Sequence, residues 1–293
     1  MNGNGRTFRE RYFTAQDGLR LYYREYGAHH TGGPVLLCLP GLARNSKDFD
    51  RLANILCGRY RVVSMDYRGR GRSEYDSNWR NYVPFTYIND VRHLLTAADI
   101  HRFVAVGTSM GGILAMYLSV AVPTAMVGAV INDIGPDVEN DALDGLMGSL
   151  RHWPHSLHGW EDGIRYLQEG FPDLPADTDE EWLELAQNSY VEDEFNGIRC
   201  DWDKNILRTV THAALTEYDF WLPFRAMHRI PVLSVRGEKS LIFSEKAFDR
   251  MAEVMPHIDR VTVPRVGHAP KLTEPEVLPA IEKLLESLAP VHE

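Results

Sequence analysis

The sequence has little of what marks several large classes of protein. Its 293 residues include only three cysteines, Cys38, Cys57 and Cys200, and an odd, widely spaced set does not suggest a disulfide framework. No stretch approaches the roughly 18 apolar residues that a membrane-spanning helix needs. The first eleven residues are polar and lack the apolar stretch of a signal peptide. We therefore expect a cytoplasmic protein that does not depend on disulfides.

Basic residues are also in deficit, with 31 Lys and Arg against 41 Asp and Glu and a formal net charge of −10. Such a chain repels phosphate backbones and anionic lipid surfaces, so we expect neither nucleic acid nor a membrane as a partner. The sequence has no glycine-rich phosphate loop and no convincing set of metal ligands. These absences leave a small-molecule substrate as the expected partner, without cofactor or metal, and nothing in the sequence indicates an oligomeric state.

Apolar runs and helical patterns alternate along most of the chain. Short apolar runs without polar alternation indicate strands that are buried on both faces of a parallel sheet. These runs are Val35–Leu39, Arg61–Met65, Phe103–Val106, Met126–Ile131 and Val232–Val235. Helical patterns lie at 49–56, 87–98 and 111–122, and a final helix repeats apolar residues from Val277 to Leu288. The alternation predicts an α/β fold with a doubly wound, mostly parallel sheet.

The alternation stops between Gly135 and about Arg225. This segment holds five of the six tryptophans, and it carries 20 acidic residues against six basic ones. The shift in composition predicts a mostly helical subdomain, residues 135–225, inserted into a core domain formed by residues 1–134 and 226–293. Its acidity is typical of a solvated face, and together with its aromatic residues it favours an apolar, uncharged or cationic ligand.

The strongest chemical signal is Gly107-Thr108-Ser109-Met110-Gly111, which matches G-x-S-x-G between a predicted strand and a predicted helix. A serine on such a sharp turn is lifted above the sheet edge. The N-terminus of the following helix favours the negative charge that develops there. Ser109 is therefore the candidate nucleophile, and the alternative is a serine that caps a helix.

Three further groups complete a candidate site. Acyl transfer needs preorganised N–H donors for the oxyanion, and the backbone of Met110 and of Leu42, which follows Pro40-Gly41, could supply them. His268 follows a predicted strand at 260–263 and precedes the final helix, from where it can reach Ser109 as a general base. The alternatives are a plain Pro-Gly turn and a structural histidine.

Together these motifs resemble those of the α/β-hydrolase superfamily, specifically its capped group of esterases, lactonases and carbon–carbon bond hydrolases. The resemblance runs from about Tyr12 to Leu288 and includes the segment at 66–73, Asp-Tyr-Arg-Gly-Arg-Gly-Arg-Ser. It implies that the insertion after Gly135 is a helical cap over the active site. It also implies a serine hydrolase that cleaves a carboxylic ester or lactone of a small, apolar substrate. The alternatives are carbon–carbon bond hydrolysis of a diketone-type substrate and receptor-like binding with degenerate catalysis.

The sequence differs from this family at the carboxylate that should orient the histidine. The resemblance implies an aspartate at position 241, where this chain has Leu241. Some relatives place the acid after the strand that follows the nucleophile helix, where this chain has Asp133, 24 residues beyond Ser109. One helix, a turn and a strand fill that interval and return Asp133 to the same sheet edge, so Asp133 is the preferred acid. Glu238 is the alternative acid, and a site without any acid is a third possibility. Asp133 could instead cap the start of the insertion.

Overall fold

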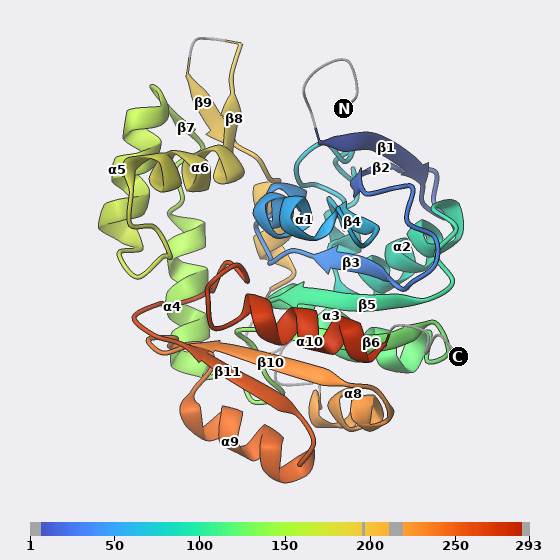
Figure 1. Cartoon of the computed structure of the whole chain (residues 1–293). Helices are drawn as coiled ribbons and strands as arrows, with labels where there is room; N and C mark the ends of the chain where they lie inside the picture. Colours follow the sequence, from blue (N-terminus) through green and yellow to red (C-terminus); the bar gives the residue numbers. More distant parts are fainter. Residues whose placement is uncertain (1–6, 195–196, 211–218, 289–293) are drawn as a thin grey trace.

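The computed structural model describes residues 7–194, 197–210 and 219–288, and an eight-stranded sheet forms its centre. The strand order is β1-β2-β4-β3-β5-β6-β10-β11 (Figure 1). The strands are β1 Phe8–Thr14, β2 Arg20–Tyr26, β3 Val35–Leu39, β4 Val62–Met65, β5 Phe103–Thr108, β6 Met126–Asn132, β10 Val232–Gly237 and β11 Asp259–Val263. Strand β2 pairs antiparallel with β1 and β4, and every other pair in this sheet is parallel. The predicted mostly parallel sheet is confirmed.

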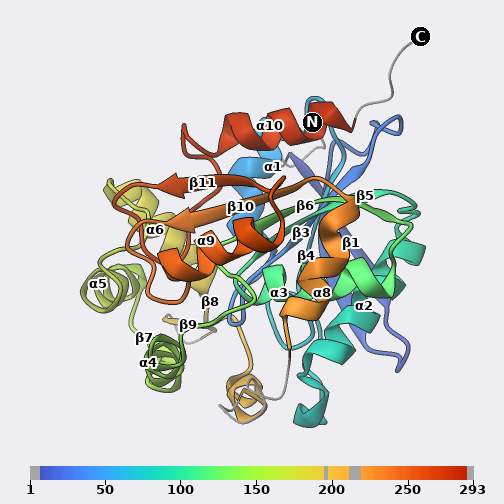
Figure 2. The ribbon, with the colours of Figure 1, turned by 90° about the horizontal axis from the view of Figure 1, so that it is seen from below.

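Helices cover both faces of this sheet, as Figure 2 shows, with α1 and α10 on one face and α2, α3, α8 and α9 on the other. Their bounds are α1 Asp50–Leu56, α2 Pro84–Ala97, α3 Met110–Ala121, α8 Trp221–Ala226, α9 Glu245–Val254 and α10 Leu278–Ser287. Each layer buries its own apolar cluster, the first around Leu56 and Ile281 and the second around Leu114 and Phe224. This arrangement confirms the doubly wound α/β fold.

Burial explains why the apolar runs of the sequence become strands. Every residue of β3, β4 and the stretch 103–107 of β5 is buried, so these strands show no polar alternation. Helix α2 begins three residues before the predicted position, because Pro84 supplies the fixed backbone angle that suits a first helical turn. Within the described ranges, no helix is both long enough and apolar enough to cross a membrane.

The segment that follows β6 leaves the sheet and forms a separate layer beyond the strand ends (Figure 1). It contains α4 Asn140–Arg151, α5 Trp160–Gly170 and α6 Asp179–Ser189, with a small antiparallel sheet of β7 Ser156–Leu157, β9 Ile198–Cys200 and β8 Tyr190–Glu192. The sequence did not indicate this small sheet, because strands of two or three residues are too short to show a period. We call the described part of residues 137–210 the insertion; its limits as a domain remain a prediction.

The end of the predicted range 135–225 packs with the core domain. Helix α8 falls almost wholly in that range, yet it packs on α3, where the Ser119 hydroxyl donates a hydrogen bond to the Pro223 carbonyl at 3.2 Å. The remaining short elements are 3₁₀ helices, namely η1 Ser46–Phe49, η2 Trp79–Asn81, η3 Lys204–Arg208 and η4 Met227–Arg229.

Candidate active site

Ser109 occupies a sharp turn between β5 and α3. Its backbone angles are φ 54° and ψ −119°, outside the regions that non-glycine residues ordinarily adopt. Two neighbours must be glycine for the turn to close. A Cβ on Gly107 would lie 2.2 Å from the Gly111 carbonyl oxygen, and one on Gly111 would lie 1.9 Å from the Leu39 carbonyl oxygen. The sequence motif therefore takes the strained strand-to-helix geometry that raises a serine above the sheet.

A short side-chain contact joins the candidate base to the candidate acid. His268 Nδ1 lies 2.8 Å from Asp133 Oδ2. Asp133 is fully buried, and its other oxygen accepts a hydrogen bond from the Gly237 N–H at 2.7 Å. The two contacts fix the carboxylate against the imidazole, so that a proton on Nδ1 would leave Nε2 as the basic nitrogen.

The alternative acid does not reach the histidine. The Glu238 carboxylate accepts a hydrogen bond from the Arg265 N–H at 2.7 Å, in an exposed position. Leu241, at the usual acid position, has 77% of its surface exposed. The structure therefore places Asp133, and neither of the residues that follow β10, beside His268.

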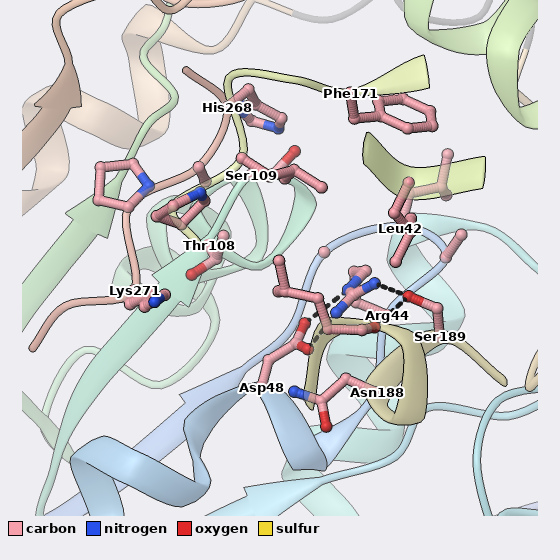
Figure 3. Close-up of a pocket in the computed structure, with 18 of the residues that line it drawn as sticks. Leu42, Arg44, Asp48, Thr108, Ser109, Phe171, Asn188, Ser189, His268 and Lys271 are labelled. Atoms are coloured by element: carbon pink, nitrogen blue, oxygen red, sulfur yellow. Dashed lines mark hydrogen bonds and ion pairs between the residues drawn. The ribbon is translucent and has the colours of Figure 1, made fainter. Parts of the chain in front are cut away.

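Ser109 and His268 lie next to one another at the rim of one cavity (Figure 3). Within the described residues, no hydrogen bond joins their side chains. Such bonds are often long in ligand-free sites and tighten when substrate binds. The His268 side chain is one-fifth exposed, at 19%, and so stays accessible from the cavity.

The backbone near Ser109 offers the two expected N–H donors. Met110 is the first residue of α3, and the N–H of a first helical residue has no acceptor within its own helix. On the other side, a Cβ added to Gly41 would lie 3.7 Å from the Ser109 Cβ, so the Gly41–Leu42 backbone passes close to the serine. The buried Arg70 donates a hydrogen bond through Nε to the Leu42 carbonyl and thereby holds this loop.

Ser109 stands where two cavities meet, and Leu42 and Leu146 also line both. His268 lines only the first cavity, which has a volume of about 190 Å³. Met110 lines only the second, which has a volume of about 340 Å³. His268 and Met110 thus line different cavities, and Ser109 lines both.

Charged residues line the first cavity in pairs. Arg44 binds both oxygens of Asp48 and donates a further hydrogen bond to the Ser189 hydroxyl at 2.6 Å (Figure 3). Glu181 accepts hydrogen bonds from Lys271 at 2.7 Å and Arg51 at 2.9 Å. Burial opposes ionisation of Glu181, but the Asp177 N–H and the Lys271 ammonium outweigh it and lower the pKa of Glu181 to about 2. The Glu181 carboxylate therefore stays ionised and paired at neutral pH.

The described residues offer little reactive chemistry beyond this site. Across the described residues, no group of three or more His, Cys, Asp or Glu side chains could hold a metal ion. The three cysteines are free, and burial raises the pKa of the Cys38 and Cys200 thiols, which disfavours the reactive thiolate form.

Sequence reasoning missed the polar residues that surround the serine. Arg44 and Lys271 line the first cavity, and Arg70 holds the Leu42 loop. Lys271 could have been noticed because it lies three residues after His268. Nothing in the sequence signals Arg44, because its partner Ser189 is 145 residues away.

Comparisons with known proteins place the chain among enzymes that share this fold. The family model for the alpha/beta hydrolase fold matches residues 34–275. A 3-hydroxybutyrate-oligomer hydrolase from Cupriavidus necator is 32% identical over 266 residues, which cover 87% of this chain and 89% of the relative. A 2-(acetamidomethylene)succinate hydrolase from Mesorhizobium japonicum is 26% identical over 92% of each chain.

A solved structure extends the likeness to three dimensions. The crystal structure of an alpha/beta hydrolase from Novosphingobium aromaticivorans is 40% identical, has a TM-score of 0.89, and is matched over 96% of this chain and 98% of its own. The chain therefore belongs to the α/β hydrolase family.

Proposed function

We propose that this protein is a serine hydrolase that cleaves a carboxylic ester or lactone through an acyl-enzyme. The observation that carries the proposal is the 2.8 Å contact between His268 and the buried Asp133, beside a serine on a strained turn. A histidine oriented in this way can act as the general base for an adjacent hydroxyl. The activity named for the relative from Cupriavidus necator supports an ester, because hydroxy acids form oligomers through ester bonds.

The residues have distinct roles in the proposed mechanism. His268 takes the hydroxyl proton as Ser109 Oγ attacks the carbonyl carbon, and the N–H groups of Leu42 and Met110 stabilise the oxyanion. His268 then gives the proton to the leaving alcohol, which departs as the acyl-enzyme forms. Water repeats the attack and releases the acid with the serine restored. Asp133 holds the imidazole and stabilises its protonated form.

The first test compares the wild-type protein with Ser109→Ala on p-nitrophenyl acetate and p-nitrophenyl hexanoate. We expect turnover by the wild type and a loss in kcat of roughly 10⁵- to 10⁶-fold in the variant, because the variant lacks the hydroxyl that forms the acyl-enzyme. A fluorophosphonate probe should label the wild type at Ser109, and a thermal melt should show that the variant is folded.

Each contrary outcome has a different consequence for the proposed function. Turnover retained by Ser109→Ala would contradict the proposal directly. A wild type that is labelled but does not hydrolyse esters would favour carbon–carbon bond hydrolysis of a diketone-type substrate. A wild type that is neither labelled nor active would favour a receptor-like protein with degenerate catalysis.

A further inference from the structure

The position of His268 sets the direction in which an ester can lie across Ser109. In the proposed mechanism the histidine must hand its proton to the departing alcohol oxygen, so the alcohol part has to leave on the histidine side. His268 lines the first cavity and not the second. The alcohol part therefore belongs in the first cavity, and the acyl part extends into the second.

The second cavity suits an uncharged acyl group. Among the described residues that line it, the only charged one is Asp137, whose carboxylate binds Trp221 Nε1 at 2.7 Å and Arg250 at 2.8 Å. The rest of the described lining is mainly apolar or aromatic, as at Ile113 and Leu143. A charged acyl group would lose its hydration here without gaining a partner.

The first cavity differs because its cations have hydrogen-bond donors in excess. Lys271 Nζ gives one N–H to Glu181 and has others left, since an ammonium carries several donors and no acceptor. Arg44 uses each of its three nitrogens once, toward Asp48 and Ser189, and both terminal nitrogens retain a second N–H. Both side chains line the cavity and are partly buried.

Each acidic residue that lines the same cavity is paired with a basic side chain. Arg44 binds both oxygens of Asp48. Glu181 accepts from Lys271 and Arg51 through one oxygen and from the Asp177 N–H through the other, and Glu184 accepts from Arg51. The acidity of the insertion favours an uncharged or cationic ligand only if its carboxylates are unpaired. Here the carboxylates are paired with cations, and Lys271 and Arg44 still have N–H groups from which an anion could accept hydrogen bonds.

We propose that the alcohol part of the substrate carries a carboxylate, which binds in the first cavity to Lys271 and Arg44. The substrate class is then an ester between an uncharged acid and the hydroxyl group of a hydroxy acid. The inference rests on the proposed function, because it uses the direction of proton transfer from His268. Charge-assisted hydrogen bonds to a carboxylate are stronger than neutral ones, so the two cations favour this class over its uncharged analogues.

The test uses substrates that differ only in charge on the alcohol side. They are 3- and 4-(butanoyloxy)benzoate and the corresponding benzamides, which share the acyl group and differ by the carboxylate. The measured quantity is the ratio of kcat/KM for each acid to that for its amide, since a general loss of activity cancels in it. We expect the wild type to prefer at least one of the acids, and added salt to reduce this preference.

Three variants locate the effect. Lys271→Met and Arg44→Gln should each lower the ratio about tenfold, the size expected for loss of a hydrogen bond between charged groups. Glu181→Gln should raise the ratio, because it removes the carboxylate that competes for Lys271. Lys283→Met is the matched control, since Lys283 is an exposed lysine paired with Asp259 outside both cavities, and its ratio should equal that of the wild type.

The outcomes separate this inference from the proposed function. If the amide esters are hydrolysed through Ser109 but the wild type shows no preference for either acid, the inference is wrong and the proposed function stands. The inference is also wrong if Lys271→Met and Arg44→Gln both leave the ratio unchanged. If no ester is hydrolysed and Ser109 is not labelled by the fluorophosphonate, the proposed function fails, and the inference fails with it.

Discussion

The loops that follow β6 and β10 both carry an acidic residue at the same edge of the sheet, but they differ in burial and direction. Asp133, after β6, is fully buried, and its oxygens bind His268 and the Gly237 N–H. Glu238, after β10, is exposed and binds the Arg265 N–H. A charge screened from water interacts more strongly with an imidazolium, so only the first carboxylate suits the task.

The loop after β10 contributes in another way. The Gly237 N–H, at the end of β10, holds the Asp133 carboxylate, so β10 supports an acid that β6 supplies. Beyond it, the Ser240 N–H donates to the Gly237 carbonyl at 3.0 Å, and the chain turns so that Leu241 faces solvent. Under the proposed function, this comparison means that burial and direction define the acid, whichever loop carries it.

The largest effect should come from Asp133→Asn. We expect kcat on p-nitrophenyl acetate to fall by roughly 10³- to 10⁴-fold, because the amide favours the wrong tautomer of His268 and cannot stabilise its protonated form. Glu238→Gln is the matched control in the other loop, and it should change kcat by less than about threefold. A collapse in Glu238→Gln with activity retained in Asp133→Asn would reverse the comparison. Thermal unfolding of both variants checks that they are folded.

A second experiment asks whether the usual acid position can be restored. In the Asp133→Asn background, Leu241→Asp should leave kcat within about threefold of the single variant, because a side chain directed into solvent behaves as a surface substitution. Recovery of tenfold or more would show that the loop after β10 can bring a carboxylate to His268. That result would contradict the argument that the loop after β10 directs residue 241 away from His268.

The sequence predicted the parts of the site that follow from topology. Carboxyl ends of parallel strands meet at one sheet edge, so the end of β6 could be expected near Ser109 from the spacing of helix and strand alone. The structure brings Asp133 to His268 at that edge. The fold class followed from the same alternation of buried runs and helices.

Contacts across long stretches of chain could not be predicted in the same way. Lys271 meets Glu181 across 90 residues, and Arg44 meets Ser189 across 145. Such pairs form only where the insertion packs against the core domain. The local periodicity of apolar residues does not predict that packing. The sequence also did not indicate that Leu241 faces solvent, because a turn of a few residues sets its orientation.

The smallest difference in kcat that we expect between the two loops concerns Asn132, the residue that precedes Asp133. Asn132, the last residue of β6, donates through Nδ2 to the Pro270 carbonyl at 2.8 Å and to Thr108 Oγ1 at 3.0 Å. It therefore ties the His268 loop to the strand that carries Asp133. Asn132→Ala removes both hydrogen bonds and should lower kcat about five- to tenfold, since the bond to Pro270 holds the histidine loop and one hydrogen bond is worth about 1 kcal/mol.

The matched variant in the other loop is Ser240→Ala, which removes the hydrogen bond that the Phe243 N–H donates to the Ser240 hydroxyl oxygen. It should change kcat by less than about threefold, because this bond shapes the exposed turn around Leu241 and does not hold the histidine loop. Rates on p-nitrophenyl acetate and melting temperatures should be measured for both variants. Equal losses of activity at equal stability would mean that the two loops support His268 alike. A loss confined to Asn132→Ala would place the support of the histidine loop, together with its acid, at the end of β6.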